Sequence, residues 1–274
     1  MIYVLSGIGA RIVSNSYLNV FQKILTNDGN KPSVVNFYTY LGLTILGILL
    51  IPFICVQFSA EIVFNFLCMG ILGALGNYFI IKALSVGELS SLAPINSYKP
   101  VVALIIAYFY LNEVPSLFAI LGILFIIFGT YILNKSISSN KLAIFYRVLA
   151  LIFSGTEAVF IKKIILLTNI PTSFMLWAVS GLIFSLALVI KSKPDKKLPN
   201  IKYLLLLILS VAIMQYSTNF VFSKINVSYA LALFQLSTLL SVFLGVNIFK
   251  EEDLKRKLIA SFIMILGAIT IILS

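Results

Sequence analysis

The stretch NEVPSLFAILGILFIIFGTYIL, residues 112–133, holds a short polar break followed by an unbroken apolar run. Pro115 suits the start of a helix, because the N–H that proline lacks would have no partner there. The apolar run is long enough for a helix to cross about 30 Å of hydrocarbon. The stretch therefore predicts a transmembrane helix that begins just after the break.

Similar apolar runs occur along the whole chain. Polar, helix-stopping segments separate them, such as NDGNKPS at 27–33 and KSKPDKKLPN at 191–200. We therefore expect an all-α integral membrane protein with ten transmembrane helices. The predicted spans are 2–22, 34–56, 62–84, 92–111, 117–134, 143–166, 172–190, 202–223, 229–249 and 257–273.

Composition supports a membrane protein and narrows the chemistry. The chain of 274 residues is 61% hydrophobic and 11% charged, whereas a soluble domain carries about 25% charged residues. Most of the Lys and Arg residues behind the net charge of +11 lie in short connections, which indicates membrane orientation rather than nucleic-acid binding. The sequence has no histidine, and its two cysteines form no CxxC motif, so we expect no metal, cofactor or disulfide framework.

The opening stretch has a second, looser copy. Residues 112–133 align with KEEDLKRKLIASFIMILGAITI, residues 250–271, so that Glu113 meets Glu251. Five spans precede the polar connection in the middle of the chain, and five follow it.

This symmetry predicts two five-helix repeats, 1–135 and 143–274, joined by a loop at 136–142 within a single membrane domain. A five-span unit begins and ends on opposite sides of the membrane, so two tandem copies must be inverted. Inverted repeats with a site at their interface are the usual architecture of a secondary transporter.

The distribution of charge predicts an orientation. Fourteen Lys and Arg residues fall on the side of the loops after spans 1, 3, 5, 7 and 9, against three on the other side. The positive-inside rule places the first side in the cytoplasm and both termini outside. We expect a multi-pass protein of a bacterial or archaeal cell (inner) membrane.

Residues 83–133, ALSVGELSSLAPINSYKPVVALIIAYFYLNEVPSLFAILGILFIIFGTYIL, resemble the drug/metabolite transporter superfamily, specifically its EamA-type ten-span branch. The resemblance implies a secondary transporter that works by alternating access. It does not indicate the substrate, because family members carry amino acids, nucleosides, quaternary amines, nucleotide-linked sugars and drugs. The matching features are Ala83-Leu84 after the third span, the small residues and Pro94 that open the fourth, Asn112-Glu113 at its end, and the spacing of Gly122 and Gly129 in the fifth.

The first span departs from the pattern of the small multidrug members, which hold a glutamate there. This span carries polar residues such as Arg11 and Asn15 but no acid. The sixth span, its repeat partner, carries Glu157 instead, at the position that aligns with Tyr17. The coupling carboxylate therefore cannot be assigned to the first span.

Polar residues inside membrane spans are rare and mark transport pathways. We expect the repeat-related spans 1 and 6, 3 and 8, and 4 and 9 to line a central cavity. The candidate substrate-binding residues are Arg11, Asn15, Asn77, Tyr78, Ser97, Tyr98, Lys99, Glu157, Gln215, Tyr216 and Gln235.

Glu157 is the acid, among nine, that lies near the middle of a predicted span. Desolvation there favours the protonated form, whereas a nearby cation favours the carboxylate. A group poised between these states can exchange a proton for a substrate, so Glu157 is the predicted proton-coupling residue. The alternative is a static structural pair with Arg11 or Arg147.

Two substrate classes stay open. Arg11 could hold a carboxylate through two hydrogen bonds, and together with Glu157 it could bind both ends of a zwitterion such as an amino acid. Alternatively, aromatic rings near Glu157 could surround a quaternary amine or a drug cation. Alternatively, the side chains of Arg11 and Lys99 place their charged ends at the membrane surface and have no role in substrate binding.

Local packing can also be predicted. Pro94 and Pro100 should kink the fourth span, and Glu113 should face water at a helix end. Gly70 and Gly76 lie in a run of small residues that lets helices approach closely.

Other protein classes fit less well. An intramembrane enzyme usually needs several acids, histidines or metal ligands at one interface, so we expect no catalytic residues. The sequence has no GxxxxGK[ST] phosphate-binding loop for an ATP-driven pump. We expect a small-molecule substrate, lipid contacts, a proton as the coupling ion, no cofactor, and a monomer or homodimer.

Overall fold

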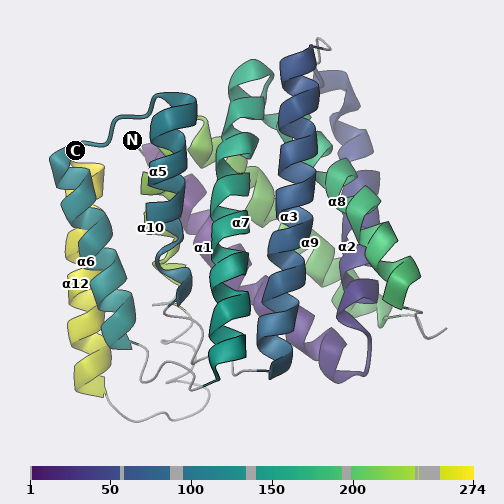
Figure 1. Cartoon of the computed structure of the whole chain (residues 1–274), viewed down its shortest axis with the longest axis horizontal. Helices are drawn as coiled ribbons and strands as arrows, with labels where there is room; N and C mark the ends of the chain where they lie inside the picture. Colours follow the sequence, from purple (N-terminus) through teal and green to yellow (C-terminus); the bar gives the residue numbers. More distant parts are fainter. Residues whose placement is uncertain are drawn as a thin grey trace. The chain divides into compact units, whose positions relative to one another are not determined.

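The computed structural model describes residues 2–55, 59–86, 95–133, 140–192, 199–237, 240 and 254–274. Within these ranges every regular element is a helix. The helices are α1 (Ile2–Asn27), α2 (Pro32–Gly47), the 3-10 helix η1 (Ile48–Phe53), α3 (Ala60–Val86), α5 (Lys99–Leu111), α6 (Leu117–Leu133), α7 (Lys141–Leu167), α8 (Ile170–Ser192), α9 (Ile201–Phe222), α10 (Val227–Phe234) and α12 (Leu254–Ile272) (Figure 1).

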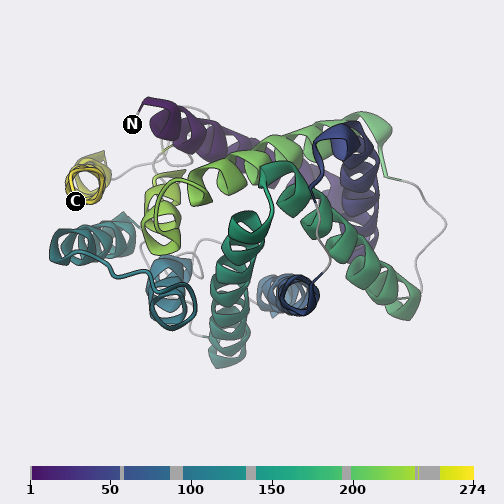
Figure 2. The same cartoon turned by 90° about the horizontal axis from the view of Figure 1, so that it is seen from above.

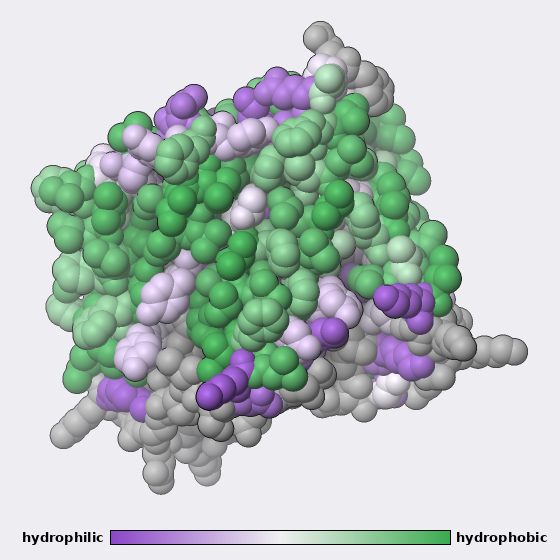
Figure 3. Space-filling view, viewed as in Figure 1, coloured by the Kyte–Doolittle hydropathy of each residue, from purple (hydrophilic) through white to green (hydrophobic). Residues whose placement is uncertain are grey.

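The long apolar helices identify an integral membrane protein. Apolar side chains cover most of the face shown in Figure 3, as expected where helices meet lipid. The all-helical class is confirmed, but the number of spans is not fixed at ten, because five helices in the described ranges are long and apolar enough to cross a membrane. These five are Ser33–Phe53, Ala60–Ile80, Lys141–Leu167, Ile170–Lys191 and Ile201–Phe222.

The fourth predicted span differs from the structure. Its helix, α5, begins at Lys99, and Pro100 lies in the first turn. A proline there costs no hydrogen bond, because the first N–H groups of a helix have no partner within it. Residues 95–96 are helical and residues 97–98 form a turn before α5, so the predicted span is interrupted beside Pro100. Pro94 lies outside the described residues.

Packing divides the chain into two compact units. The first consists of Met1–Ala74 and Phe160–Lys224, and the second of Leu75–Val159 and Ile225–Ser274. Each unit combines helices from both predicted repeats, and α3 and α7 contribute to both units. The packing units therefore differ from the predicted sequence halves, whose boundaries stay a prediction.

In the first unit, α1 packs along α9, and α2 packs along α8 (Figure 2). Glycine permits the first of these contacts, since a Cβ at Gly7 would lie 2.9 Å from a ring carbon of Phe220. Aromatic packing supports the second, where the rings of Tyr40 and Trp177 are 5.1 Å apart.

In the second unit, α6 and α12 lie side by side (Figures 1 and 2). A Cβ at Gly122 or at Gly267 would lie 2.6 Å from the carbonyl oxygen of the other glycine. Small residues let membrane helices approach closely in this way. A separate small core joins α3, α7 and the segment before α5 through Ala83, Ile95, Ala143 and Leu151.

Candidate functional site

The predicted site residues are divided between the two units. The first unit holds Arg11, Asn15, Gln215 and Tyr216. The second unit holds Asn77, Tyr78, Ser97, Tyr98, Lys99, Glu157 and Gln235. The pairing of Arg11 with Glu157 around one zwitterion therefore stays a prediction.

Glu157 lies sixteen residues after the first residue of α7 and ten before the last, which is about 24 Å and 15 Å from the two helix ends. Its side chain is half-buried. A Cβ at Gly76 of α3 would lie 3.3 Å from Ser154, and a Cβ at Gly155 would lie 2.9 Å from Val102 of α5. These close contacts hold α7 against both α3 and α5 beside the carboxylate.

Arg147 lies ten residues before Glu157 in the same helix. Ten helical residues span about 15 Å, which is too far for an ion pair, so the predicted alternative of a static Glu157–Arg147 pair is wrong. The Arg147 side chain is 8% exposed, and its Nε atom has no hydrogen-bond partner among the described residues. In the sequence Arg147 lies near the start of a predicted span, and this position does not indicate a buried side chain.

An aromatic cluster joins α3 to α7 in the second unit. The Nζ atom of Lys82 lies 4.8 Å from the ring centre of Tyr78 and 5.2 Å from that of Tyr146. Phe79 stacks on Tyr146 at 6.0 Å and on Phe153 at 5.7 Å. Two aromatic faces within about 6 Å of a cation attract it electrostatically, so Tyr78 and Tyr146 can hold an ammonium group.

The other candidates in the second unit differ in exposure. Ser97 is fully buried just before α5, whereas the next residue, Tyr98, is 46% exposed. Lys99 and Asn77 are half-buried. Gln235 is buried at the end of α10, where its amide donates to the carbonyl of Leu231 at 3.4 Å.

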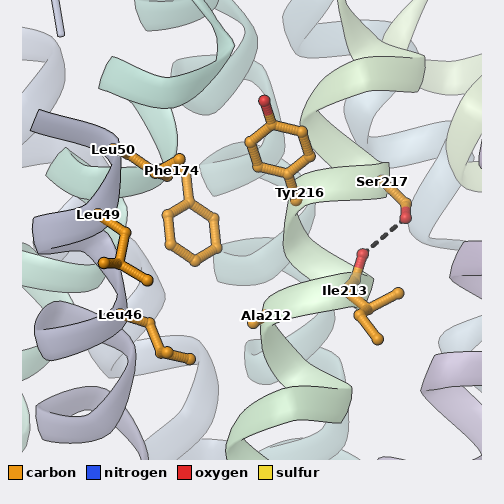
Figure 4. Close-up of a pocket in the computed structure, with 8 residues that line it drawn as sticks. All are labelled: Leu46, Leu49, Leu50, Phe174, Ala212, Ile213, Tyr216 and Ser217. Carbon is orange, nitrogen blue, oxygen red and sulfur yellow. Dashed lines mark hydrogen bonds between the residues drawn. The ribbon is translucent and has the colours of Figure 1, made fainter. Parts of the chain in front are cut away.

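Gln215 and Tyr216 are neighbours in α9 but have different surroundings. Gln215 is buried, and its side-chain amide lies 2.9 Å from the side-chain amide of Asn219. The Tyr216 ring packs edge-on against Phe174 at 6.1 Å. Both rings line a cavity of about 380 Å³ within the first unit (Figure 4), together with Leu46, Leu49, Leu50, Ala212, Ile213 and Ser217.

This cavity is suited to an apolar group. Six of its eight lining residues are aliphatic or Phe, and the Ser217 hydroxyl already donates to the Ile213 carbonyl at 2.6 Å (Figure 4). Gln215, the polar candidate next to it, is not part of the lining.

On α1, the predicted polar face is partly used by the helix itself. The hydroxyls of Ser14 and Ser16 donate to the carbonyls of Ala10 and Ile12, at 2.6 and 3.2 Å. Such bonds satisfy a buried hydroxyl within its own helix. Arg11 and Asn15 are half-buried and lie one turn apart, so they share a face.

The loop after α5 makes a polar contact that the sequence did not reveal. Oε2 of Glu113 accepts a hydrogen bond from the Val227 N–H at 2.9 Å, and the Tyr229 hydroxyl accepts one from the Ser116 N–H at 2.8 Å. A carboxylate at a helix N-terminus satisfies a free N–H and complements the helix dipole. Glu113 therefore caps α10, and the prediction that it faces water is wrong.

Comparison with known proteins identifies the class. The model of the EamA-like transporter family matches residues 2–135 and again residues 141–273. The chain belongs to this family. Two matches in tandem establish the two-repeat architecture of EamA-like proteins. Membership places the chain among transporters of the drug/metabolite superfamily and points away from an enzyme.

One solved structure, described as "Crystal structure of protein", matches this EamA-like chain with a TM-score of 0.80. The match covers 99% of this chain and 98% of that one, and the sequences are 16% identical. At this identity the likeness shows the fold alone. No curated protein matches the sequence.

Proposed function

We propose that this EamA-like transporter moves a small polar metabolite, an amino acid or a related zwitterion, by secondary active transport with alternating access. The observation that carries the proposal is the half-buried carboxylate of Glu157 near the middle of α7. An ionisable side chain at such depth is costly and marks a substrate pathway or a proton relay. Glu157 then alternates between a proton and the substrate.

The other acids of the described residues lie at helix ends. Asp28 is in the turn after α1, and Glu113 caps α10. Glu61 is in the first turn of α3, where its carboxylate pairs with Nζ of Lys163 at 2.9 Å. These three carboxylates lie at helix ends, which leaves Glu157 as the candidate for coupling among the described acids.

Arg11 is the proposed contact for the carboxylate of the zwitterion. A guanidinium can form two parallel hydrogen bonds to a carboxylate, and the amide of Asn15 lies one turn further along α1. We also propose that the protein resides in the cell membrane of a bacterium or archaeon with its basic loops in the cytoplasm. The excess of Lys and Arg on one set of loops supports this orientation.

The coupling role can be tested by flux into proteoliposomes. Glu157→Gln removes the proton-binding carboxylate but keeps the size of the side chain. Wild-type protein should accumulate a radiolabelled amino acid when a pH gradient is imposed. The variant should lose this response to the gradient while it remains folded, as judged by size-exclusion chromatography.

Glu61→Gln is the matched control, because it removes a carboxylate that is 51% exposed and paired at a helix end. This variant should keep gradient-driven uptake. Uptake by Glu157→Gln that matches the wild-type response would refute the coupling role. Failure of wild-type protein to take up any amino acid would refute the substrate class.

An organic cation is the second candidate substrate. The observation that favours it is the ammonium group of Lys82 over the rings of Tyr78 and Tyr146, since the same pair of rings can hold a quaternary amine. Tyr146→Leu should then weaken uptake of labelled tetraethylammonium, and Arg11→Gln should not. For an amino acid substrate we expect uptake to depend on Arg11.

A further inference from the structure

The second unit contains a buried cation, Arg147, that the proposed function does not use. Its side chain is 8% exposed. Its Nε is enclosed without a hydrogen-bond partner, and no ion pair joins it to another described residue. A charge taken out of water is costly unless other groups compensate it. No described side chain thus compensates the enclosed Nε of this guanidinium.

Arg147 points into the interior of its unit rather than toward lipid. Ala143 and Leu151 lie one turn before and one turn after it, and both belong to the core cluster with Ala83 and Ile95. Residues four apart in a helix share a face. Arg147 therefore lies on the core face of α7.

A second side-chain cation lies on the neighbouring helix. Lys82 of α3 reaches Tyr146, the residue next to Arg147, with its Nζ 5.2 Å from the ring centre. The described acid of α7, Glu157, is about 15 Å further along the helix. The charges described around this part of α7 are therefore positive, and they complement an anion.

We propose that Arg147 binds an oxyanion, a carboxylate or phosphate group, in the interior of the second unit. The planar guanidinium matches either group through two parallel hydrogen bonds. The inference rests on the proposed function in assigning this oxyanion to a transported solute. A lipid headgroup phosphate presents the same chemistry, and the experiment separates the two sources.

The test measures thermal stability of the purified protein in neutral detergent. Acetate, citrate and inorganic phosphate are compared with chloride at matched ionic strength, because a bound anion raises the melting temperature by mass action. At least one of acetate, citrate and phosphate should raise the melting temperature of the wild type above its value in chloride. Arg147→Met should weaken the apparent affinity for that anion on the order of tenfold to a hundredfold. The affinity of Arg147→Lys should lie between those of the wild type and Arg147→Met, since an ammonium keeps the charge but cannot form the two parallel hydrogen bonds of a guanidinium.

A structural role predicts a different pattern. If Arg147 only supported the fold, Arg147→Met would melt at a lower temperature and respond to anions as the wild type does. If Arg147 binds an anion, ligand-free Arg147→Met should melt at or above the wild-type melting temperature, because the substitution removes an uncompensated buried charge. Lys141→Met is the matched control, since Lys141 is exposed at the first position of the same helix. Its anion affinity should be unchanged.

Nanodiscs with and without phosphatidylglycerol separate a solute from a lipid. Stabilisation by phosphatidylglycerol that Arg147→Met abolishes, without an effect of soluble anions, would assign the oxyanion to a headgroup and overturn the solute assignment. Absence of stabilisation by acetate, citrate, phosphate and phosphatidylglycerol alike, or equal losses in Lys141→Met and Arg147→Met, would overturn the site itself. Anion binding is measured without transport. A negative outcome of the flux test on Glu157→Gln would therefore not change the conclusion about anion binding at Arg147.

Discussion

A methyl group at Gly122 should loosen the contact between α6 and α12. A Cβ there would lie 2.6 Å from the carbonyl oxygen of Gly267, whereas ordinary van der Waals contact begins at 3.4 Å. A backbone carbonyl cannot rotate away as a side chain can. The helices must therefore separate by several tenths of an ångström, and the packing along their shared face loosens.

The expected cost follows from packing. Inserting a methyl group into a well-packed contact costs about 1–3 kcal/mol. Membrane helices gain little from burying apolar surface against each other, so close packing is a large part of what holds this pair together. Helices in lipid stay helical when they separate, so the better helix propensity of alanine offsets little. We expect Gly122→Ala to lower the unfolding free energy by about 2 kcal/mol, which is roughly a thirtyfold change in the equilibrium constant.

Reversible unfolding in mixed micelles of dodecyl maltoside and dodecyl sulfate measures this difference. Gly9→Ala is the matched control, because a Cβ at Gly9 meets no atom within 4 Å, and it should stay within about 0.5 kcal/mol of wild type. The double variant Gly122→Ala/Gly267→Ala should lose less than the sum of the single losses, since one separation relieves both clashes. If Gly122→Ala unfolds like Gly9→Ala, the close approach of the two backbones is refuted.

Two further predictions concern a cap and the membrane orientation. Glu113→Ala should lower the unfolding free energy by about 0.5–2 kcal/mol, because the Val227 N–H loses its acceptor. The same assay on Glu61→Ala, which breaks an exposed ion pair, should give about 0–1 kcal/mol, and equal small losses would contradict the cap. In a cysteine-free background, Ser136→Cys in the predicted cytoplasmic loop should resist an impermeant maleimide added to whole cells, while Ser274→Cys should react. The reverse labelling pattern would show that the orientation is inverted.

The fold was predictable where it depends on local chemistry. Hydrophobic runs and proline-containing breaks predict the helices, because the bilayer sets their length and backbone geometry sets their ends. Pro100 shows the limit of this reasoning. A proline inside an apolar run predicts a kink, and the structure has a turn at 97–98 from which a separate helix begins. Whether the chain before Pro100 continues the helix depends on packing with other segments, which the local sequence does not contain.

The candidate site was less predictable, because it depends on contacts between distant residues. Glu113 and its partner Val227 are 114 residues apart, and no local pattern joins them. Gly70 and Gly76 look like one stripe of small residues, but Gly70 faces Phe184 of α8 and Gly76 faces Ser154 of α7. Arg147 is a basic residue near a span end in the sequence, and only the packing of α7 shows that it is buried.

Glu157 and Arg147 lie on one helix, and their separation constrains any mechanism that uses both. About 15 Å of helix divides them, much more than the distance between the two charges of one α-amino acid. A substrate bound at Arg147 cannot compete directly for the carboxylate of Glu157, so coupling between them would require a conformational change. Coupling of this kind is reciprocal. If a bound anion alters the proton affinity of Glu157, then protonation of Glu157 alters anion affinity by the same factor. A pH dependence of anion binding that disappears in Glu157→Gln would join the two residues in one transport cycle, and a pH dependence unchanged by that substitution would leave Arg147 energetically separate from proton coupling.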